Sequence, residues 1–306
     1  MYSMREYFIK HLGSECFESR EEFKLEISAG DLGVDAIYDP YNDRLKLFNL
    51  SARDLHNSDF MDIFTVKSAI DSAYTKLTIY ATGNDVDTWH RYGFRYEGSI
   101  PGFFRNSGKA MLWARYFDLD RESTPLQKEH SKIVDLARNE KYVKPALRTG
   151  YKYGVVDSED STEVSRLLRN IFETYPSQIT AKWIKEYINS EKNIFRCVRS
   201  KDGKIVAVAS AEIDHKHSNA ELTDCATLPK ERSKGHMAYI VHMLEQELKA
   251  SHNIKCFYSL ARASQPGINF VFSRLGFIYT GRLFNNCRMP DGWESMNIWC
   301  RMENTG

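Results

Sequence analysis

Residues 226–237 read Ala226-Thr227-Leu228-Pro229-Lys230-Glu231-Arg232-Ser233-Lys234-Gly235-His236-Met237. A β-type run ends in this stretch, a basic loop with one glycine follows, and a helical pattern begins after the glycine. Backbone N–H groups at the start of a helix converge on one point, and the helix dipole favours an anion there. Arg232 and Lys234 add positive charge, and Gly235 lets the backbone approach a phosphate closely. The stretch therefore predicts a loop that binds a pyrophosphate without a metal ion.

Two common phosphate loops do not fit this stretch. It lacks the P-loop pattern GxxxxGK[ST], and it lacks the dinucleotide fingerprint GxGxxG. An ordinary basic turn between a strand and a helix is the simpler alternative. The position of the loop within the surrounding order of elements favours the phosphate-binding interpretation.

The second half of the chain alternates strand and helix patterns with clear turn signals. Strands are expected at residues 151–156, 193–199, 204–213, 220–228, 255–261, 277–285 and 296–301. Helices are expected at residues 158–171, 180–189, 236–250 and 266–275. The resulting order, β-α-α-β-β-β-α-β-α-β-β, predicts a mixed α/β fold.

The first half shows a weaker version of the same plan. Strands are expected at residues 23–27, 34–38, 45–50 and 77–80, helices near 59–73 and 85–92, and two more strands up to 117. Residues 92–98 (YGFRYEG) resemble residues 275–281 (LGFIYTG), and residues 112–115 (LWAR) resemble residues 298–301 (IWCR). Two matches at nearly the same offset favour a duplicated fold over chance.

A charged, helix-prone segment separates the two halves. It covers residues 119–147 and is expected to form a linker helix. The predicted division is an N-terminal domain at 1–120, a linker helix at 121–149 and a catalytic domain at 150–306.

Composition excludes several classes of protein. The 306 residues are 42% hydrophobic and 27% charged, with a formal net charge of +1, so no global field favours nucleic acid or an anionic membrane. No apolar run approaches the roughly 18 residues of a membrane span, and no signal peptide is recognisable at the start. The six cysteines include no CxxC pair, which favours free thiols in a reducing cytosol. We expect a soluble cytoplasmic protein, and the sequence leaves its oligomeric state open.

The phosphate loop resembles a known family motif. Arg232-x-x-Gly235-x-Met237 is similar to the Arg/Gln-x-x-Gly-x-Gly/Ala motif with which GNAT N-acetyltransferases cradle the pyrophosphate of coenzyme A. The resemblance implies a GNAT fold for the second half and acetyl-CoA as co-substrate. The departure is Met237, where that family usually has Gly or Ala. Residues 51–57 of the first half lack a glycine, so a GNAT-like first half is expected to be degenerate and to have lost coenzyme binding.

A closer resemblance covers nearly the whole chain. The segments that carry it are 100–104 (IPGFF), 172–176 (FETYP), 219–224 (NAELTD), 258–264 (YSLARAS), 281–287 (GRLFNNC) and 296–299 (MNIW). Together they look like the β-lysine N6-acetyltransferases. Membership implies acetylation of the ε-amine of L-β-lysine, giving Nε-acetyl-β-lysine, a compatible solute used in osmoadaptation. No metal is implied.

Acetyl transfer needs a group that removes a proton from the amine, because an ε-ammonium has an ordinary pKa near 10.4. Glu221 is the first candidate, since several GNAT enzymes place a glutamate base on the strand that leads into the coenzyme loop. Asp224 and Glu212 are reserve candidates. For each carboxylate, an ion pair at a strand edge is the alternative.

Other parts of the predicted site rest on the resemblance. Many GNAT enzymes carry a tyrosine acid where this chain has Phe272, so either the thiolate leaves unassisted or Tyr258 or Tyr279 substitutes. The residues expected to bind coenzyme A are Ala226, Thr227, Leu228, Arg232, Ser233, Lys234, Gly235, His236, Met237 and Gln265.

Binding of the substrate carboxylate is expected in a polar cluster near the end of the chain. Arginine pairs with carboxylates through two hydrogen bonds. The cluster comprises Arg282, Asn285, Asn286 and Arg288, and a polar loop is the alternative. His215 and His217 are expected to be solvated turn residues without a metal.

Two rival functions stay open at this point. One is acetylation of another amine, such as lysine, a polyamine or a peptide. The other is a non-catalytic protein that binds acyl-CoA, which Phe272 and Met237 suggest.

Overall fold

The computed structural model describes residues 4–67, 73–105, 108–172, 179–190, 193–290 and 292–302. The strands of its first half are β1 (Phe23–Ala29), β2 (Leu32–Asp39), β3 (Arg44–Leu50), β4 (Lys76–Ala81), β5 (Arg95–Phe104) and β6 (Gly108–Tyr116). The helices of that half are α1 (Met4–Leu12), α2 (Ser58–Met61) and α4 (Val86–Arg91), and the segment between the halves contains α5 (Leu119–Glu122) and α6 (Gln127–Arg138).

The second half follows the predicted order of elements. Its strands are β7 (Lys152–Val155), β8 (Asn193–Arg199), β9 (Ile205–Asp214), β10 (Asn219–Thr227), β11 (Cys256–Arg262), β12 (Ile278–Met289) and β13 (Gly292–Met302). Its helices are α7 (Ser161–Ile171), α8 (Ala181–Ile188), α9 (His236–His252) and α10 (Pro266–Arg274). The Asp157 side chain accepts a hydrogen bond from the Glu159 N–H in the turn before α7, and the Thr180 side chain accepts one from the Trp183 N–H at the start of α8. The mixed α/β class is confirmed.

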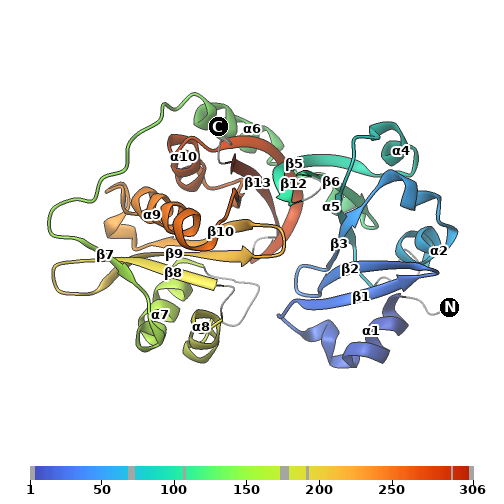
Figure 1. Cartoon of the computed structure of the whole chain (residues 1–306), viewed down its shortest axis with the longest axis horizontal. Coiled ribbons are helices and arrows are strands. Elements are labelled where there is room, and N and C mark those ends of the chain that lie inside the picture. The colour runs from blue at the N-terminus through green and yellow to red at the C-terminus, as the bar shows by residue number, and fades with distance from the viewer. Residues whose placement is uncertain are drawn as a thin grey trace.

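All described strands form one sheet with the order β1-β2-β3-β4-β6-β5-β12-β13-β11-β10-β9-β8-β7. Each half contains an antiparallel three-stranded meander, one parallel pair (β3 with β4, β10 with β11) and a final antiparallel hairpin. The hairpins β5–β6 and β12–β13 meet in the middle of the molecule, so the halves are arranged as two lobes (Figure 1). The order β1-β2-β3-β4-β6-β5 therefore repeats as β8-β9-β10-β11-β13-β12.

Side-chain contacts repeat with the strand order. Arg115 donates to the carbonyl of Tyr92 at 3.0 Å, and Arg301 donates to the carbonyl of Leu275 at 2.5 Å. These two pairs lie in the segments whose sequences resemble each other. The structure thus supports a duplicated fold.

The aromatic packing behind each hairpin is also repeated. In the first half, the Trp89 and Phe94 rings meet edge to face at a centroid distance of 5.2 Å. In the second half, Phe272 and Phe277 do the same at 5.1 Å. Phe272 is fully buried in this arrangement. Phe272 is therefore a core residue.

The two halves meet at a pair of glycines. Gly98 of β5 lies opposite Gly281 of β12, with φ angles of 150° and 155°. A Cβ atom on Gly281 would lie 2.3 Å from both the Glu97 carbonyl oxygen and the Gly98 Cα. Only glycine permits this approach, because those clashing atoms belong to the backbone.

Buried polar contacts hold the halves together beside the glycines. Lys76 of β4 pairs with Glu97 of β5 at 2.8 Å, and both side chains are fully buried. Lys76 also donates to the Phe284 carbonyl at 2.8 Å, and the Phe284 N–H donates to Glu97 at 2.8 Å. Tyr116 donates a further hydrogen bond to Glu97. A buried ion pair with all these partners fixes the register of β12 against the first half.

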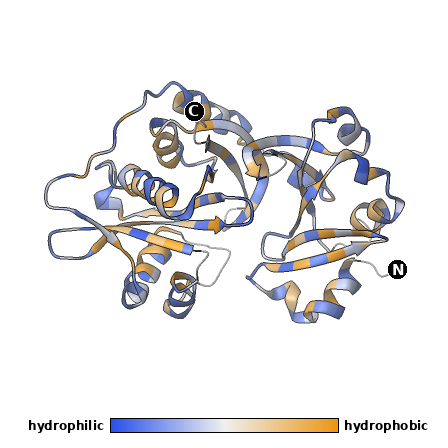
Figure 2. Cartoon of the chain, in the orientation of Figure 1, coloured by the Kyte–Doolittle hydropathy of each residue, from blue (hydrophilic) through white to orange (hydrophobic). Residues whose placement is uncertain are grey.

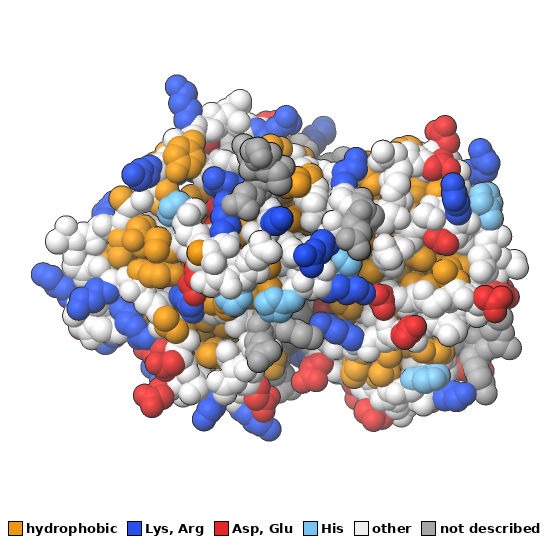
Figure 3. Space-filling model, viewed as in Figure 1, with side chains coloured by type: hydrophobic (Ala, Val, Ile, Leu, Met, Phe, Trp, Pro, Cys, Tyr) orange, Lys and Arg blue, Asp and Glu red, His pale blue; other side chains and the backbone are white. Residues whose placement is uncertain are grey.

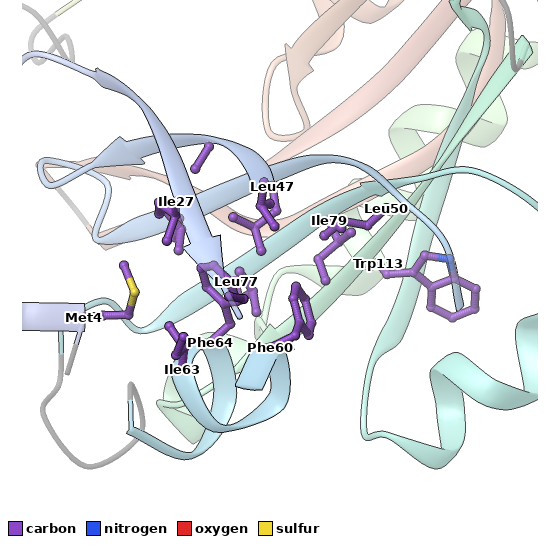
Figure 4. Close-up of a cluster of buried hydrophobic side chains, with 14 of the residues drawn as sticks. Met4, Ile27, Leu47, Leu50, Phe60, Ile63, Phe64, Leu77, Ile79 and Trp113 are labelled. Carbon is purple, nitrogen blue, oxygen red and sulfur yellow. The ribbon is translucent and has the colours of Figure 1, made fainter. Parts of the chain in front are cut away.

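Separate hydrophobic clusters cover the faces of the sheet. In the first half, Met4, Phe60, Ile63 and Phe64 from α1, α2 and the following turn pack on strand residues such as Leu77 (Figure 4). In the second half, α7 and α8 lie on one face of the sheet and α9 and α10 on the other (Figure 1). Hydrophobic residues run along the strands, while the helices carry both kinds (Figure 2). Within the described part of the chain, no helix has the length and apolarity needed to cross a bilayer.

Two expected helices are wrong in extent. The predicted linker helix over residues 121–149 is helical only in α5 and α6, and residues 140–148 have no regular structure. Lys144 precedes Pro145, which disfavours a helical backbone there. The helix expected at 59–73 is the four-residue α2 followed by a π-helical turn, Asp62–Lys67, and residues 68–72 lie outside the described part. Most of the 172–176 motif also lies outside it.

Gly281→Ala is expected to lower the free energy of unfolding by about 3 kcal/mol, because the new Cβ overlaps the backbone of β5. The matched control is Gly154→Ala in β7, where a Cβ meets nothing within 4 Å and the φ angle is not positive. Urea unfolding of both variants measures the difference. Equal stability of the two variants would show that the glycine junction does not constrain the fold.

Candidate active site

The parallel strands β10 and β11 form a fork. Their pairing covers only Asn219–Glu221 against Cys256–Tyr258, although both strands continue further. A β-bulge between Thr223 and Ala226 turns β10 away, with Asp224 in a left-handed conformation (φ 51°). Beyond Glu221, the described residues of β10 therefore have no partner in β11, and their backbone groups face an opening.

A cavity of about 2270 Å³ extends from this fork to the first half of the chain. The C-terminal half contributes the fork, the loop before α9 and part of α8, and the N-terminal half contributes side chains of β1–β4. In the space-filling view, histidine and basic side chains gather where the two lobes meet (Figure 3). The cavity is large enough for a substrate and a coenzyme together.

Glu221 lies at the point where the fork opens. Burial, together with the neighbouring carboxylate of Glu212, raises its pKa to about 8. A hydrogen bond with Tyr258 and the positive charge of Lys46 act in the opposite direction. A carboxyl group with this pKa is a stronger base than an ordinary carboxylate and can take a proton from an amine once it is ionised.

The two reserve carboxylates also line the cavity. Glu212 is the cross-strand neighbour of Glu221 and accepts a hydrogen bond from Tyr187 of α8. The surrounding protein desolvates the Glu212 carboxylate and so raises its pKa, although part of the side chain is exposed to the open cavity. Asp224 is buried, accepts a hydrogen bond from Ser210 at 2.5 Å, and has a pKa raised to about 7 by burial. The structure thus brings all three predicted carboxylates to one cavity, with Glu221 at the fork.

The loop before α9 has the geometry of an anion site. Gly235 is the N-cap of α9 with a φ angle of 84°, and Ser233 has a φ angle of 61°. The first-turn amides of a 17-residue helix have no helical acceptors and point out of its N-terminus. The predicted coenzyme residues that line the cavity are Thr227, Arg232, Ser233, Gly235, His236, Met237 and Gln265.

Three predicted coenzyme residues have other surroundings. Lys234 donates to Glu231 at 2.9 Å and to the Tyr151 hydroxyl at 3.0 Å, and it does not line the cavity. Ala226 and Leu228 pack in the hydrophobic core beneath the loop. Ala226 and Leu228 face inward because residues two apart at the end of a strand point to the same side.

The cluster predicted to bind a carboxylate is divided by the structure. Arg282 donates to Asn297 at 2.8 Å and is 6% exposed, while Asn285 donates to the Arg121 carbonyl at 3.0 Å. The backbone N–H of Arg288 donates a hydrogen bond to the side-chain oxygen of Asn42 in the first half. None of Arg282, Asn285 and Arg288 lines the cavity.

Asn286 is the member of that cluster that does line the cavity. Its carbonyl accepts a hydrogen bond from Arg44 at 3.0 Å. The polar run that reads as a loop is in fact the continuation of β12 to Met289, and it binds the first half. Local sequence cannot reveal this, because Arg44 lies 242 residues before Asn286 in the chain.

The structure separates the alternatives for a proton donor. Tyr258 lines the cavity and is hydrogen-bonded to Glu221, and burial raises the pKa of its phenol well above 10. Tyr279 packs against Trp299 at a centroid distance of 5.8 Å and does not line the cavity. Of these two candidates, Tyr258 is therefore the one that lies at the cavity.

His215 and His217 lie in the hairpin between β9 and β10, at the cavity. The His217 ring meets Phe104 of the first half edge to face at 5.3 Å. Across the residues that the structure describes, no group of three His, Cys, Asp or Glu side chains could hold a metal ion.

Several residues of the site were not predicted from the sequence. Glu22, Arg44, Lys46 and Tyr80 belong to the first half and line the same cavity as Glu221. The only local signal is the alternation of β3, which puts Arg44 and Lys46 on the face opposite the buried Leu45 and Leu47.

Comparison with known proteins assigns this chain to a family. The model of the acetyltransferase (GNAT) family matches residues 162–277. The chain is 35% identical to the β-lysine N(6)-acetyltransferase of Methanosarcina mazei over 74% of its own length and 91% of that protein. It is 30% identical to the N-acetyltransferase YodP of Bacillus subtilis (77% of this chain, 85% of that protein). It is 25% identical to the β-lysine N(6)-acetyltransferase of Methanococcus maripaludis (74% and 82%).

Proposed function

The chain is an N-acetyltransferase of the GNAT family, and we propose that it transfers the acetyl group of acetyl-CoA to the ε-amine of L-β-lysine. The observation that supports the reaction is Glu221, whose carboxyl group stands at the fork with a pKa of about 8. The similarity to two β-lysine N(6)-acetyltransferases over most of the chain supports the substrate.

In the proposed reaction, Glu221 takes a proton from the ε-ammonium, and the free amine attacks the thioester carbon of acetyl-CoA. The C–N bond forms, the C–S bond breaks, and coenzyme A leaves as a thiolate that takes up one proton. Tyr258, which is held on Glu221, is the phenol that can supply that proton, and it regains one from the attacking nitrogen, which loses its second proton as the amide forms. The exposed backbone of β10 beyond Glu221 offers N–H donors to the thioester oxygen as negative charge develops. No metal takes part in this scheme.

We propose that acetyl-CoA lies along the fork, with its pyrophosphate at the N-terminus of α9. Gly235 and Ser233 shape the loop, and Arg232 is exposed beside it to pair with phosphate. Gln265, the N-cap residue of α10, lies on the same cavity wall.

The first half is proposed not to bind a coenzyme. Its equivalent segment begins with a capping box in which the Ser51 N–H donates to Asp54 at 2.6 Å. Asp54 thus occupies the helix start with a negative charge, where a phosphate would need amides. This supports the division into a degenerate domain at 1–120, a linker at 121–149 and a catalytic domain at 150–306.

The product suggests a physiological role that we also propose. β-Lysine carries a net positive charge near neutral pH, and acetylation of the ε-amine leaves a neutral zwitterion. A neutral zwitterion is suited to accumulate in the cytoplasm as a compatible solute. NMR of extracts from cells that express the chain at rising salt would show a matching rise of Nε-acetyl-β-lysine, and a constant level would count against this role.

The proposed substrate is tested by thiol release from acetyl-CoA with β-lysine, α-lysine, spermidine and a peptide. We expect kcat/KM to be highest for β-lysine. Preference for another amine would establish that rival acetyltransferase. Tight acetyl-CoA binding without turnover of any amine would establish the non-catalytic alternative.

The pH dependence tests the role of Glu221. A carboxyl group with a pKa of about 8 is protonated and inactive as a base below that pH, so kcat/KM should rise tenfold per pH unit and level off near pH 8. Glu221→Gln should lower kcat/KM by roughly 10²- to 10⁴-fold and abolish this rise with pH, the acidic limb of the profile.

Glu212→Gln is the matched control for that variant. It should stay active and move the limb to lower pH, because the charge of Glu212 raises the pKa of Glu221. A limb that persists in Glu221→Gln and vanishes in Glu212→Gln would assign the base to Glu212.

A further inference from the structure

Lys46 of the first half occupies the position that Glu221 occupies in the second half. In the first half, Lys46 pairs with Thr78 of β4, and Thr78 pairs with Ala114 of β6. Ala114 directly follows the repeated tryptophan of the first half, Trp113.

The same path in the second half starts at Glu221. Glu221 pairs with Tyr258 of β11, and Tyr258 pairs with Cys300 of β13. Cys300 directly follows the repeated tryptophan of that half, Trp299. The two paths match strand by strand, so Lys46 and Glu221 are equivalent positions of the duplicated fold.

The bulge beyond each position is also repeated. Three residues after Lys46, Asn49 has a φ angle of 60°, and three residues after Glu221, Asp224 has a φ angle of 51°. The ladder shifts register at both places. The first half has therefore kept the local backbone of the base position while carrying the opposite charge.

Lys46 faces the same cavity as Glu221 from the opposite side. Its ammonium pairs with Glu22 at 2.7 Å, and the two side chains are 17% and 38% exposed. Both charges are near enough to act on the pKa of Glu221, which Lys46 lowers and Glu22 raises. The ion pair and the candidate base are thus parts of one site.

An aromatic wall connects the ion pair to the base. Phe48 lies two residues from Lys46 on the same face of β3, and its ring meets Tyr80 at a centroid distance of 4.8 Å. Tyr80 meets Phe103 at 5.2 Å, and Phe103 meets Tyr258 at 5.7 Å. Tyr258 in turn is hydrogen-bonded to Glu221. The wall offers an apolar surface between the two polar ends.

We propose that Lys46 and Glu22 bind the amino-acid head of the substrate, Lys46 its carboxylate and Glu22 its β-ammonium. The three methylenes lie on the aromatic wall, and the ε-amine reaches Glu221. This inference rests on the proposed function. A zwitterionic head matches an ion pair group for group, and charge-assisted hydrogen bonds to both ends fix its orientation.

Three other cations at the cavity have acidic partners outside the Lys46–Glu22 pair. Arg44 pairs with buried Asp39 at 2.8 Å, lies 3.5 Å from Glu22 and donates to the Asn286 carbonyl. Arg262 pairs with Glu294 at 3.2 Å, and Lys216 is 73% exposed beside Asp35. Lys46 therefore combines cavity exposure with a partner that a substrate ammonium can share.

The test compares three amines that share the same reacting end. β-Lysine has both head charges, pentane-1,4-diamine lacks the carboxylate, and 6-aminohexanoate lacks the β-amine. Lys46→Met should lower kcat/KM for β-lysine and for 6-aminohexanoate roughly 10- to 100-fold relative to the diamine. Glu22→Gln should lower it for β-lysine and the diamine relative to 6-aminohexanoate.

Two variants serve as controls. Lys24→Met removes another lysine at the same cavity and should leave the ratios between the three amines unchanged. Lys46→Arg keeps the charge and should retain most of the preference. A change in the pKa of Glu221 affects all three amines alike. The ratios of kcat/KM between the amines therefore report only on binding of the amino-acid head.

The outcomes separate this inference from the proposed function. If the wild-type chain acetylates β-lysine and Lys46→Met lowers kcat/KM equally for all three amines, or for none, the subsite is wrong and the function stands. If the wild-type chain does not acetylate β-lysine, the proposed function fails and the subsite fails with it.

Discussion

The backbone contact between Gly98 and Gly281 is the constraint on which the rest of the structure depends. Two half-sheets can join into one only if β5 and β12 approach closely, and a Cβ on either glycine would overlap the opposite strand. The Lys76–Glu97 pair then seals the junction in a fully buried environment. Because a buried ion pair is stable only with its partners in place, this contact selects one arrangement of the halves. The cavity between the lobes has its shape for that reason.

The electrostatics of the cavity follow from the same closure. Burial raises the pKa of Glu221 to about 8 and that of Asp224 to about 7, because a carboxylate is less well solvated there than in water. Lys46 reaches the site from the other half and counteracts this effect on Glu221. The proton affinity of the candidate base is therefore a property of both halves, although the base itself lies in one.

The duplicated halves have diverged at the positions that carry chemistry. The second half keeps Gly235 at an open helix start, whereas the first half closes the corresponding start with Ser51 and Asp54. The second half has Glu221 at the fork, whereas the first half has Lys46 at the equivalent position. Both halves retain the strand order and the bulge. One copy can thus serve the coenzyme and the other the substrate.

The sequence by itself determined the order of strands and helices in the second half and the loop at Gly235, because periodicity and turns are encoded locally. Glu221 was singled out by the resemblance to GNAT enzymes. The sequence also indicated the duplication through short matching segments. Only the tertiary structure decided that Asn285 and Arg288 bind residues outside their own half, that Arg282 is held by Asn297, that Lys234 pairs with Glu231, and that Lys46 faces Glu221. These roles depend on pairing between strands far apart in the chain, and no local pattern records which distant strand a residue will meet.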